Sequence, residues 1–185
     1  CSLSAQTLET MNHIVTRYAI EQAKITGTKQ RMDTTAYETN IHYPTDSSLL
    51  WDSFRTVARL GRSIQKELPQ LDLHHRYHDR KVKKLATFIA RNASSTRKAT
   101  QRQVKQRYRK LIESVRWIHG VGQHILARLD AHDYRAPALS HYLPLVERVI
   151  HQAHQRVIEG ITLPPDEKLY SLFEEHTELL KRGKA

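Results

Sequence analysis

The chain has 185 residues, of which 39% are hydrophobic, and 30 Lys and Arg residues against 19 Asp and Glu residues give it a formal net charge of +11. Its length allows one domain with a substantial core, or part of a larger domain. No stretch approaches the apolar length that spans a bilayer, and the single cysteine, Cys1, excludes an internal disulfide. We therefore expect a soluble, cytoplasmic protein whose positive charge favours a polyanionic partner.

The first predicted element is a helix from Leu3 to Lys24, for which Ser4 is a suitable N-cap and Gly27 marks the exit. Apolar side chains recur in it at three- and four-residue steps, so that one face of the helix is apolar. This stripe consists of Leu8, Met11, Ile14, Val15 and Tyr18.

A strand-like block and a turn follow this helix. Residues 30–41 are rich in Thr, Tyr and Ile, which indicates one or two short strands. Pro44 fixes its own φ and disfavours the helical region for the residue before it, so the chain is expected to turn there. Asp46 or Ser47 should then cap a helix that begins at Ser48.

Periodic apolar residues predict four more helices, separated by polar, glycine or proline breaks. Gly120-Val121-Gly122 is expected to interrupt or kink the third of them before it resumes to Asp130. The fourth carries a near-heptad apolar seam, Leu139–Val157. The predicted ranges are Ser48–Glu67, Tyr77–Asn92, Thr100–His119 and Pro137–Gly160.

Pro164 and Pro165 separate the last of these helices from the C-terminal segment. Within that segment, the sequence pattern by itself favours a helix over Leu169–Phe173. The overall prediction is a mainly α fold: a small bundle of long antiparallel helices with a short β element.

The positive charge is concentrated in one segment of the chain. Between Arg76 and Arg116 there are fourteen basic residues and only two acidic ones, Asp79 and Glu113. Phosphates would relieve the repulsion among so many cations, which predicts nucleic-acid binding with little sequence preference. The candidate DNA-binding residues are Arg80, Lys81, Lys83, Lys84, Arg91, Arg97, Lys98, Arg102, Lys105, Arg107, Arg109 and Lys110.

Some of the twelve histidines have spacings that suit metal ligands on one helix face, namely His74, His75 and His78, and the pair His151 and His154. The chain offers no cysteine near them and no HExxH motif. We therefore interpret them as surface histidines.

Two segments resemble bacterial insertion-sequence transposases of the DDE class, in particular the ISNCY-like group. The run DTTAYETNIHYPTDSSLLWDS (residues 33–53) is similar to the first catalytic block of that family, and EKLYSLFEEHTELLKRGKA (Glu167–Ala185) looks like its next core segment. The resemblance implies an RNase H-like core with a large helical insertion after its first strand. It divides the chain into residues 1–46 with the N-terminal helix and first core strand, residues 47–160 with the helical segment and its basic insertion 76–119, and residues 161–185 as the start of the next core strand.

In this family three carboxylates, Asp, Asp and Glu, hold two Mg²⁺ or Mn²⁺ ions that activate the attacking oxygen and stabilise the leaving one. The resemblance assigns the first of these roles to Asp33, as a catalytic residue and metal ligand. His42 and Asp46 would support the site by hydrogen bonds, or serve only in the turn. The other two carboxylates of the family lie beyond the second matching segment. A partial copy, inactive alone and without tightly bound metal, is therefore expected.

The favoured function is that of a transposase, which cuts DNA at insertion-sequence ends and joins it to target DNA in the nucleoid. Two alternatives remain open. One is a non-enzymatic helical nucleic-acid-binding module, in which Asp33 is only structural. The other is a helical interaction or dimerisation protein, a homo-oligomer built on the Leu139–Val157 seam.

Overall fold

The computed structural model describes residues 4–22, 44–130 and 132–174, and the chain divides into two units, residues 1–38 and 39–185. The predicted strands over residues 30–41 lie outside the described residues, as do Asp33 and His42.

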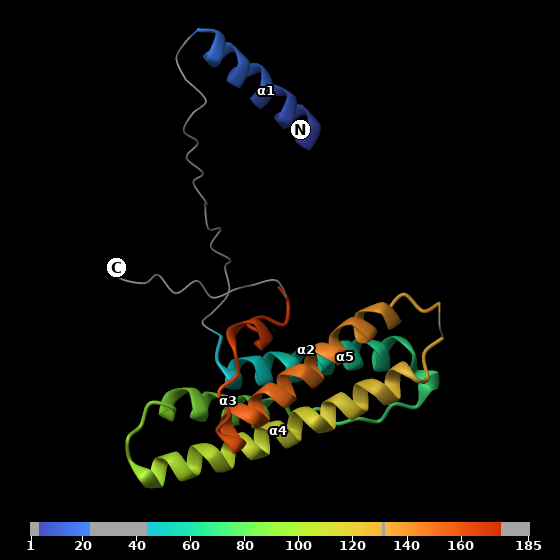
Figure 1. Ribbon diagram of the computed structural model, residues 1–185. Coiled ribbons are helices and arrows are strands. Elements are labelled where there is room, and N and C mark those ends of the chain that lie inside the picture. Colours follow the sequence, from blue (N-terminus) through green and yellow to red (C-terminus); the bar gives the residue numbers. More distant parts are fainter. Residues whose placement is uncertain (1–3, 23–43, 131, 175–185) are drawn as a thin grey trace. The chain divides into compact units, whose positions relative to one another are not determined.

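The first unit contains α1, which spans Ala5–Glu21 and confirms the predicted N-terminal helix (Figure 1). Its N-cap is Ser4, as predicted, because Ser4 Oγ accepts a hydrogen bond from the backbone N–H of Thr7 at 3.2 Å. The large apolar side chains of α1 stay exposed, from 51% for Ile20 to 65% for Val15.

The described residues of the second unit form four long helices, which confirm the mainly α prediction. Short 3₁₀ turns and one π-helical turn extend or connect them. The long helices are α2 (Asp46–Glu67), α3 (Asp79–Asn92), α4 (Lys98–Leu126) and α5 (Ala136–Ala153), and the short elements are η1 (Pro69–Leu71), η2 (His154–Glu159) and η3 (Pro165–Glu167).

The longest helix, α4, runs along the whole second unit, and α3 lies antiparallel beside its first half (Figure 1). The helices α2, α4 and α5 all contact one another, while α3 contacts α2 and α4. The predicted apolar stripes of these four helices meet in one core, whose largest fully buried side chains include Phe54, Leu50, Leu111, Ile118 and Leu139. Burying one such side chain contributes about 1.5–3 kcal/mol, so these stripes drive the helices together.

The start of α2 differs from the prediction by two residues. The N-cap is Thr45, and the helix begins at Asp46. Thr45 Oγ1 accepts from the N–H of Ser48 at 3.1 Å, and Ser48 Oγ accepts from the N–H of Thr45 at 3.0 Å. This reciprocal pair satisfies two backbone donors at once, which explains why Thr45 is preferred to Asp46 or Ser47 as the cap.

The predicted interruption at Gly120-Val121-Gly122 was wrong, since α4 is continuous from Lys98 to Leu126. Each glycine costs a helix about 1 kcal/mol relative to alanine. At Gly122 the missing side chain permits a close approach. A Cβ there would lie 2.7 Å from Leu143 Cδ2 of α5 and 3.0 Å from Val57 Cγ1 of α2.

The last predicted helix is present, although its final turn is π-helical and ends at Gly160, whose φ of 77° favours glycine. The predictions for Leu169–Phe173 were wrong, because this segment is neither helix nor strand. Leu169 and Leu172 are nonetheless fully buried. None of the described residues forms a strand, so neither the short β element nor the RNase H-like core is supported there.

Candidate nucleic-acid interface

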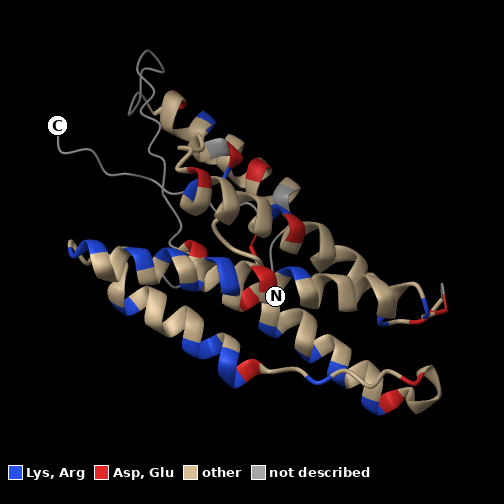
Figure 2. Cartoon of the chain, turned by 90° about the horizontal axis from the view of Figure 1, so that it is seen from below, with Lys and Arg blue, Asp and Glu red and all other residues tan. Residues whose placement is uncertain are grey.

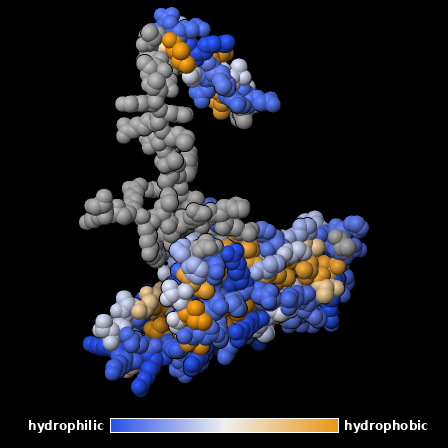
Figure 3. Space-filling view, in the orientation of Figure 1, coloured by the Kyte–Doolittle hydropathy of each residue, from blue (hydrophilic) through white to orange (hydrophobic). Residues whose placement is uncertain are grey.

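All twelve candidate DNA-binding residues lie on a single helical hairpin. We call it the basic arm and define it as α3, residues 93–97 and the first part of α4, Lys98–Lys110. Figure 2 shows Lys and Arg positions, in blue, distributed along both of its helices. On the face seen in Figure 3, the end at which α3 meets α4 carries strongly hydrophilic residues.

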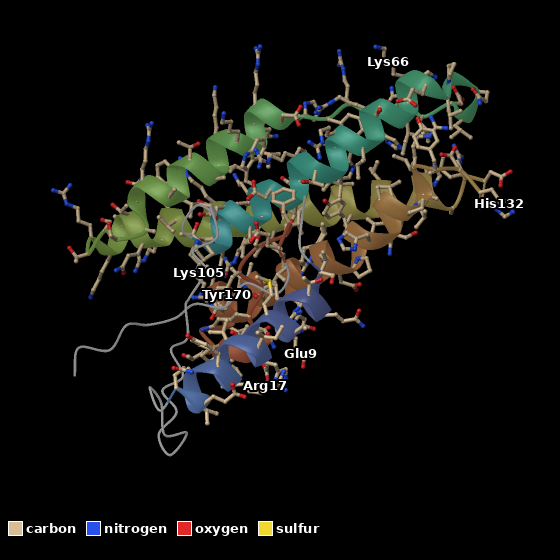
Figure 4. The ribbon with its side chains drawn as sticks, turned by 90° about the horizontal axis from the view of Figure 1, so that it is seen from above. Glu9, Arg17, Lys66, Lys105, His132 and Tyr170 are labelled. Carbon is tan, nitrogen blue, oxygen red and sulfur yellow. The ribbon has the colours of Figure 1, made fainter. Side chains whose placement is uncertain are left out.

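A narrow apolar seam holds the arm together and leaves its cations outside. Val82, Ala86 and Ile89 of α3 are buried in the core, as are Tyr108 and, just after the arm, Leu111 of α4. Eleven of the twelve candidate residues are exposed. Figure 4 shows nitrogen-tipped side chains of α3 extending away from the bundle. The helical period therefore separates core residues from cations on each helix of the arm.

Two of the twelve residues also have structural contacts. Arg107 is half-buried, and its guanidinium carbon lies 3.6 Å from the centre of the Phe88 ring, which ties α4 to α3. The Nζ atom of Lys105 donates a hydrogen bond of 3.0 Å to the backbone carbonyl of Ile158, in the π-helical turn. We expect the ten other residues to contribute most of the contacts with a polyanion.

The arm keeps its excess charge because its one carboxylate, Asp79, does not neutralise it. Asp79 pairs with Arg62 of α2, outside the arm. Among the described residues, none of the twelve candidates takes part in an ion pair. A phosphate would therefore meet cations that have no competing carboxylate, and each contact would release condensed counterions from the nucleic acid.

A second group of arginines, on α2, did not stand out from the charge count along the chain. Arg55, Arg59 and Arg62 follow one another at steps of four and three residues, which places them on one helix face. They line a groove of about 390 Å³ together with Trp51 and Phe173. Helical spacing in the sequence was the signal that would have found them.

Asp46, predicted to support a metal site, is held by cationic and amide donors. It is 8% exposed, and its Oδ1 atom accepts from Arg156 Nη1 at 2.8 Å and from Gln152 Nε2 at 3.4 Å. Gln152 also pairs with the backbone of Leu169: its Oε1 accepts from the Leu169 N–H at 2.8 Å, and its Nε2 donates to the Leu169 carbonyl at 3.3 Å. The beginning of α2 and the segment around Leu169 are thereby joined through α5.

The donor set for a metal is not assembled in the part of the chain that the structure describes. Asp33 and His42 are outside it, and no three His, Cys, Asp or Glu side chains there lie so as to hold an ion. Asp46 instead accepts hydrogen bonds from Arg156 and Gln152.

The candidate histidines have other neighbours. His74 Nε2 lies 2.6 Å from Asp72 Oδ1 at the surface, and His154 Nδ1 lies 2.9 Å from Glu159 Oε1. His75 packs edge-on against Trp117 and His124. Burial, with the charges of His124 and Arg128, lowers the pKa of His75, which favours the neutral imidazole near neutral pH.

The Leu139–Val157 seam, the basis of the dimerisation hypothesis, lies within the core. Leu139, Val146 and Ala153 have no exposed surface, and α5 packs with this face against α2 and α4. The α5 residues of the seam are therefore already used inside the chain.

Comparison of the chain with protein-family models, with curated proteins and with solved structures found no match. Among the described helices, none has the combination of length and apolar character that crossing a membrane requires.

Proposed function

We propose that this chain binds DNA through the basic arm, and that it does so as part of a DDE-class insertion-sequence transposase. The observation that carries the DNA-binding proposal is the row of exposed cations along α3 and α4. Within the described residues, none of these cations takes part in an ion pair. Such a surface suits the phosphate backbone, which is the same for every sequence. Binding should therefore weaken steeply with salt and show little sequence preference.

The transposase part of the proposal rests on the resemblance of residues 33–53 to the first catalytic block of the family, which assigns Asp33 as a ligand of Mg²⁺ or Mn²⁺. The connection between Asp46 and Leu169 supports it. An insertion between two neighbouring core strands must begin and end at nearby points. Here Gln152 and Arg156 join the start of the helical unit to the segment that leaves it.

The test of DNA binding is charge reversal on α3. Replacement of Arg80, Lys81, Lys83 and Lys84 by Glu should abolish retention of duplex DNA. In variants that still bind, the magnitude of the slope of log K against log salt should decrease by about 0.9 for each lost phosphate contact. Binding is measured by fluorescence anisotropy at several salt concentrations.

A matched pair of double variants separates the arm from total charge. Lys83→Glu with Lys84→Glu lies on the arm, and Arg17→Glu with Lys66→Glu changes the net charge equally at exposed sites elsewhere (Figure 4). The first variant should lose most of its affinity and the second should keep it. Equal affinity of the two variants would refute the assignment of the interface to the arm.

The alternative is a nucleic-acid-binding module without catalysis, and it predicts the same DNA binding. The two are distinguished by the nucleotide sequence around the gene. Terminal inverted repeats, together with a reading frame that supplies an Asp and a Glu after Ala185, are expected for the transposase. Their absence would leave the non-enzymatic module as the better proposal.

A further inference from the structure

A pocket of about 820 Å³ lies where residues 74–78 pass over α3 and α4, next to the basic arm. This volume is in the range of roughly 300–1,000 Å³ that small-ligand sites have. Its apolar wall is formed by Val82 and Leu85 of α3, Phe54 of α2 and Trp117 of α4. Three Lys and Arg side chains complete the lining beside this wall.

Trp117 is held in place and still accessible. Its ring centre lies 6.5 Å from those of His75 and Tyr77, both in edge-to-face geometry, while the residue remains 44% exposed. Gly61 leaves room for the Tyr77 side chain, since a Cβ at Gly61 would lie 2.5 Å from Tyr77 Oη. A fixed indole with an accessible surface in a pocket is suited to stacking against a planar ring.

The polar lining favours a ligand with a negative charge. Arg76, Lys81 and Lys110 line the pocket, and none of them takes part in an ion pair within the described residues. Glu113 is the carboxylate in the same lining, and it can accept a hydrogen bond from an exocyclic amino group. An aromatic ring beside several cations matches the combination of base and phosphate in a nucleotide.

We propose that this pocket binds one unpaired nucleotide of a nucleic-acid strand, with its base on Trp117 and its phosphate against Arg76, Lys81 and Lys110. The strand is supplied by the DNA that the basic arm holds, so the inference rests on the proposed function. A paired base cannot enter, because both its faces are covered by the stack and its edge by its partner. The pocket therefore selects single-stranded or locally unpaired DNA.

Tryptophan fluorescence provides the direct test. The chain has two tryptophans, and Trp51→Phe leaves Trp117 as the reporter. In this background the full chain is titrated with a single-stranded oligonucleotide, with the same sequence as a duplex, with dAMP and with inorganic phosphate. Saturable quenching by the single strand and by dAMP is expected, with the single strand binding at least tenfold more tightly. Quenching by phosphate alone to the same extent would reduce the site to an anion site and overturn the proposal. Equally tight binding of dAMP and the strand would overturn the assignment to a strand.

Three variants test the site independently of folding. Trp117→Leu should weaken single-strand binding by about 5- to 150-fold, the range for loss of one base stack, and leave duplex retention unchanged. Trp117→Phe should keep much of the single-strand affinity, because phenylalanine also offers an aromatic ring for stacking. Lys110→Gln, at an exposed position, should weaken binding of dAMP without changing the melting temperature. Equal losses for single strand and duplex in Trp117→Leu, or no effect of Lys110→Gln on dAMP, would contradict the proposal.

The arm variant distinguishes failure of this inference from failure of the proposed function. Lys83→Glu with Lys84→Glu does not alter the pocket lining. It should reduce duplex retention and leave quenching by dAMP unchanged. If duplex retention survives while dAMP quenching is absent from the reporter protein, only the pocket proposal is wrong.

Discussion

Two glycines of α4 should respond in opposite ways to alanine. Gly120 is exposed, and a Cβ added to it would meet no atom within 4 Å. Gly122 is buried, and its added Cβ would lie 2.7 Å from Leu143 Cδ2 and 3.0 Å from Val57 Cγ1. Both residues lie inside one continuous helix, so the comparison isolates packing from helix propensity.

The expected magnitudes follow from these two environments. At either position alanine gains about 1 kcal/mol of helix propensity, partly by restricting the unfolded chain. At Gly120 nothing opposes this gain, and Tm should rise by about 4 °C. At Gly122 an overpacking cost of about 1–3 kcal/mol opposes it, because Leu143 and Val57 must move in a filled core. Gly122→Ala should therefore be less stable than Gly120→Ala by about 1–3 kcal/mol.

Urea unfolding followed by far-ultraviolet circular dichroism measures both variants against the wild type. The dependence of the unfolding free energy on urea should be unchanged, so that a shifted midpoint reports stability alone. If the urea midpoints of both variants shift by the same amount from that of the wild type, the close contact at Gly122 is wrong. A loss of stability in Gly120→Ala would mean that the helix does not run straight through Gly120.

Two further predictions concern polar contacts. Gln152→Leu should lower the free energy of unfolding by about 1–3 kcal/mol for each backbone group of Leu169 left without a partner, and a protease should then cut near Leu169. The exposed control Gln123→Leu should change neither property. Equal losses of unfolding free energy in the two variants, measured by urea unfolding, would contradict the role of Gln152. Hydrogen bonds from the side chain and backbone of Arg135 lower the pKa of Asp133 in the folded protein. The ionised carboxylate therefore stabilises the fold above about pH 4, the pKa of an unfolded Asp. This contribution is lost as the pH falls through the lower folded pKa. The difference in Tm between wild type and Asp133→Asn should therefore shrink from neutral to strongly acid pH, and a constant difference would refute this linkage.

Local sequence determined the helices and the basic arm. Apolar residues at three- and four-residue steps predicted the long helices, because this period places one stripe on one face whatever the partner is. The cations of the arm were found from their density along the chain, with fourteen basic residues against two acidic ones between Arg76 and Arg116. The cap at Ser4 was also readable, because it depends on residues only three positions apart.

Tertiary structure decided the features that join distant residues. Gly120-Val121-Gly122 looked like a break, yet the helix is continuous there, and the missing side chain of Gly122 lets Leu143 and Val57 approach closely. The segment Leu169–Phe173 has helical local preferences, but Gln152 holds its backbone in an irregular conformation.

The candidate pocket likewise depends on long-range placement. It joins Arg76 from a connecting segment to Trp117 some forty residues later in the chain, and no periodic pattern links the two. Local periodicity reports which face of a helix is apolar, because that is settled within a few turns. Which helix faces meet depends on how side chains from separate helices pack together in the same space. Only the tertiary structure determines this packing.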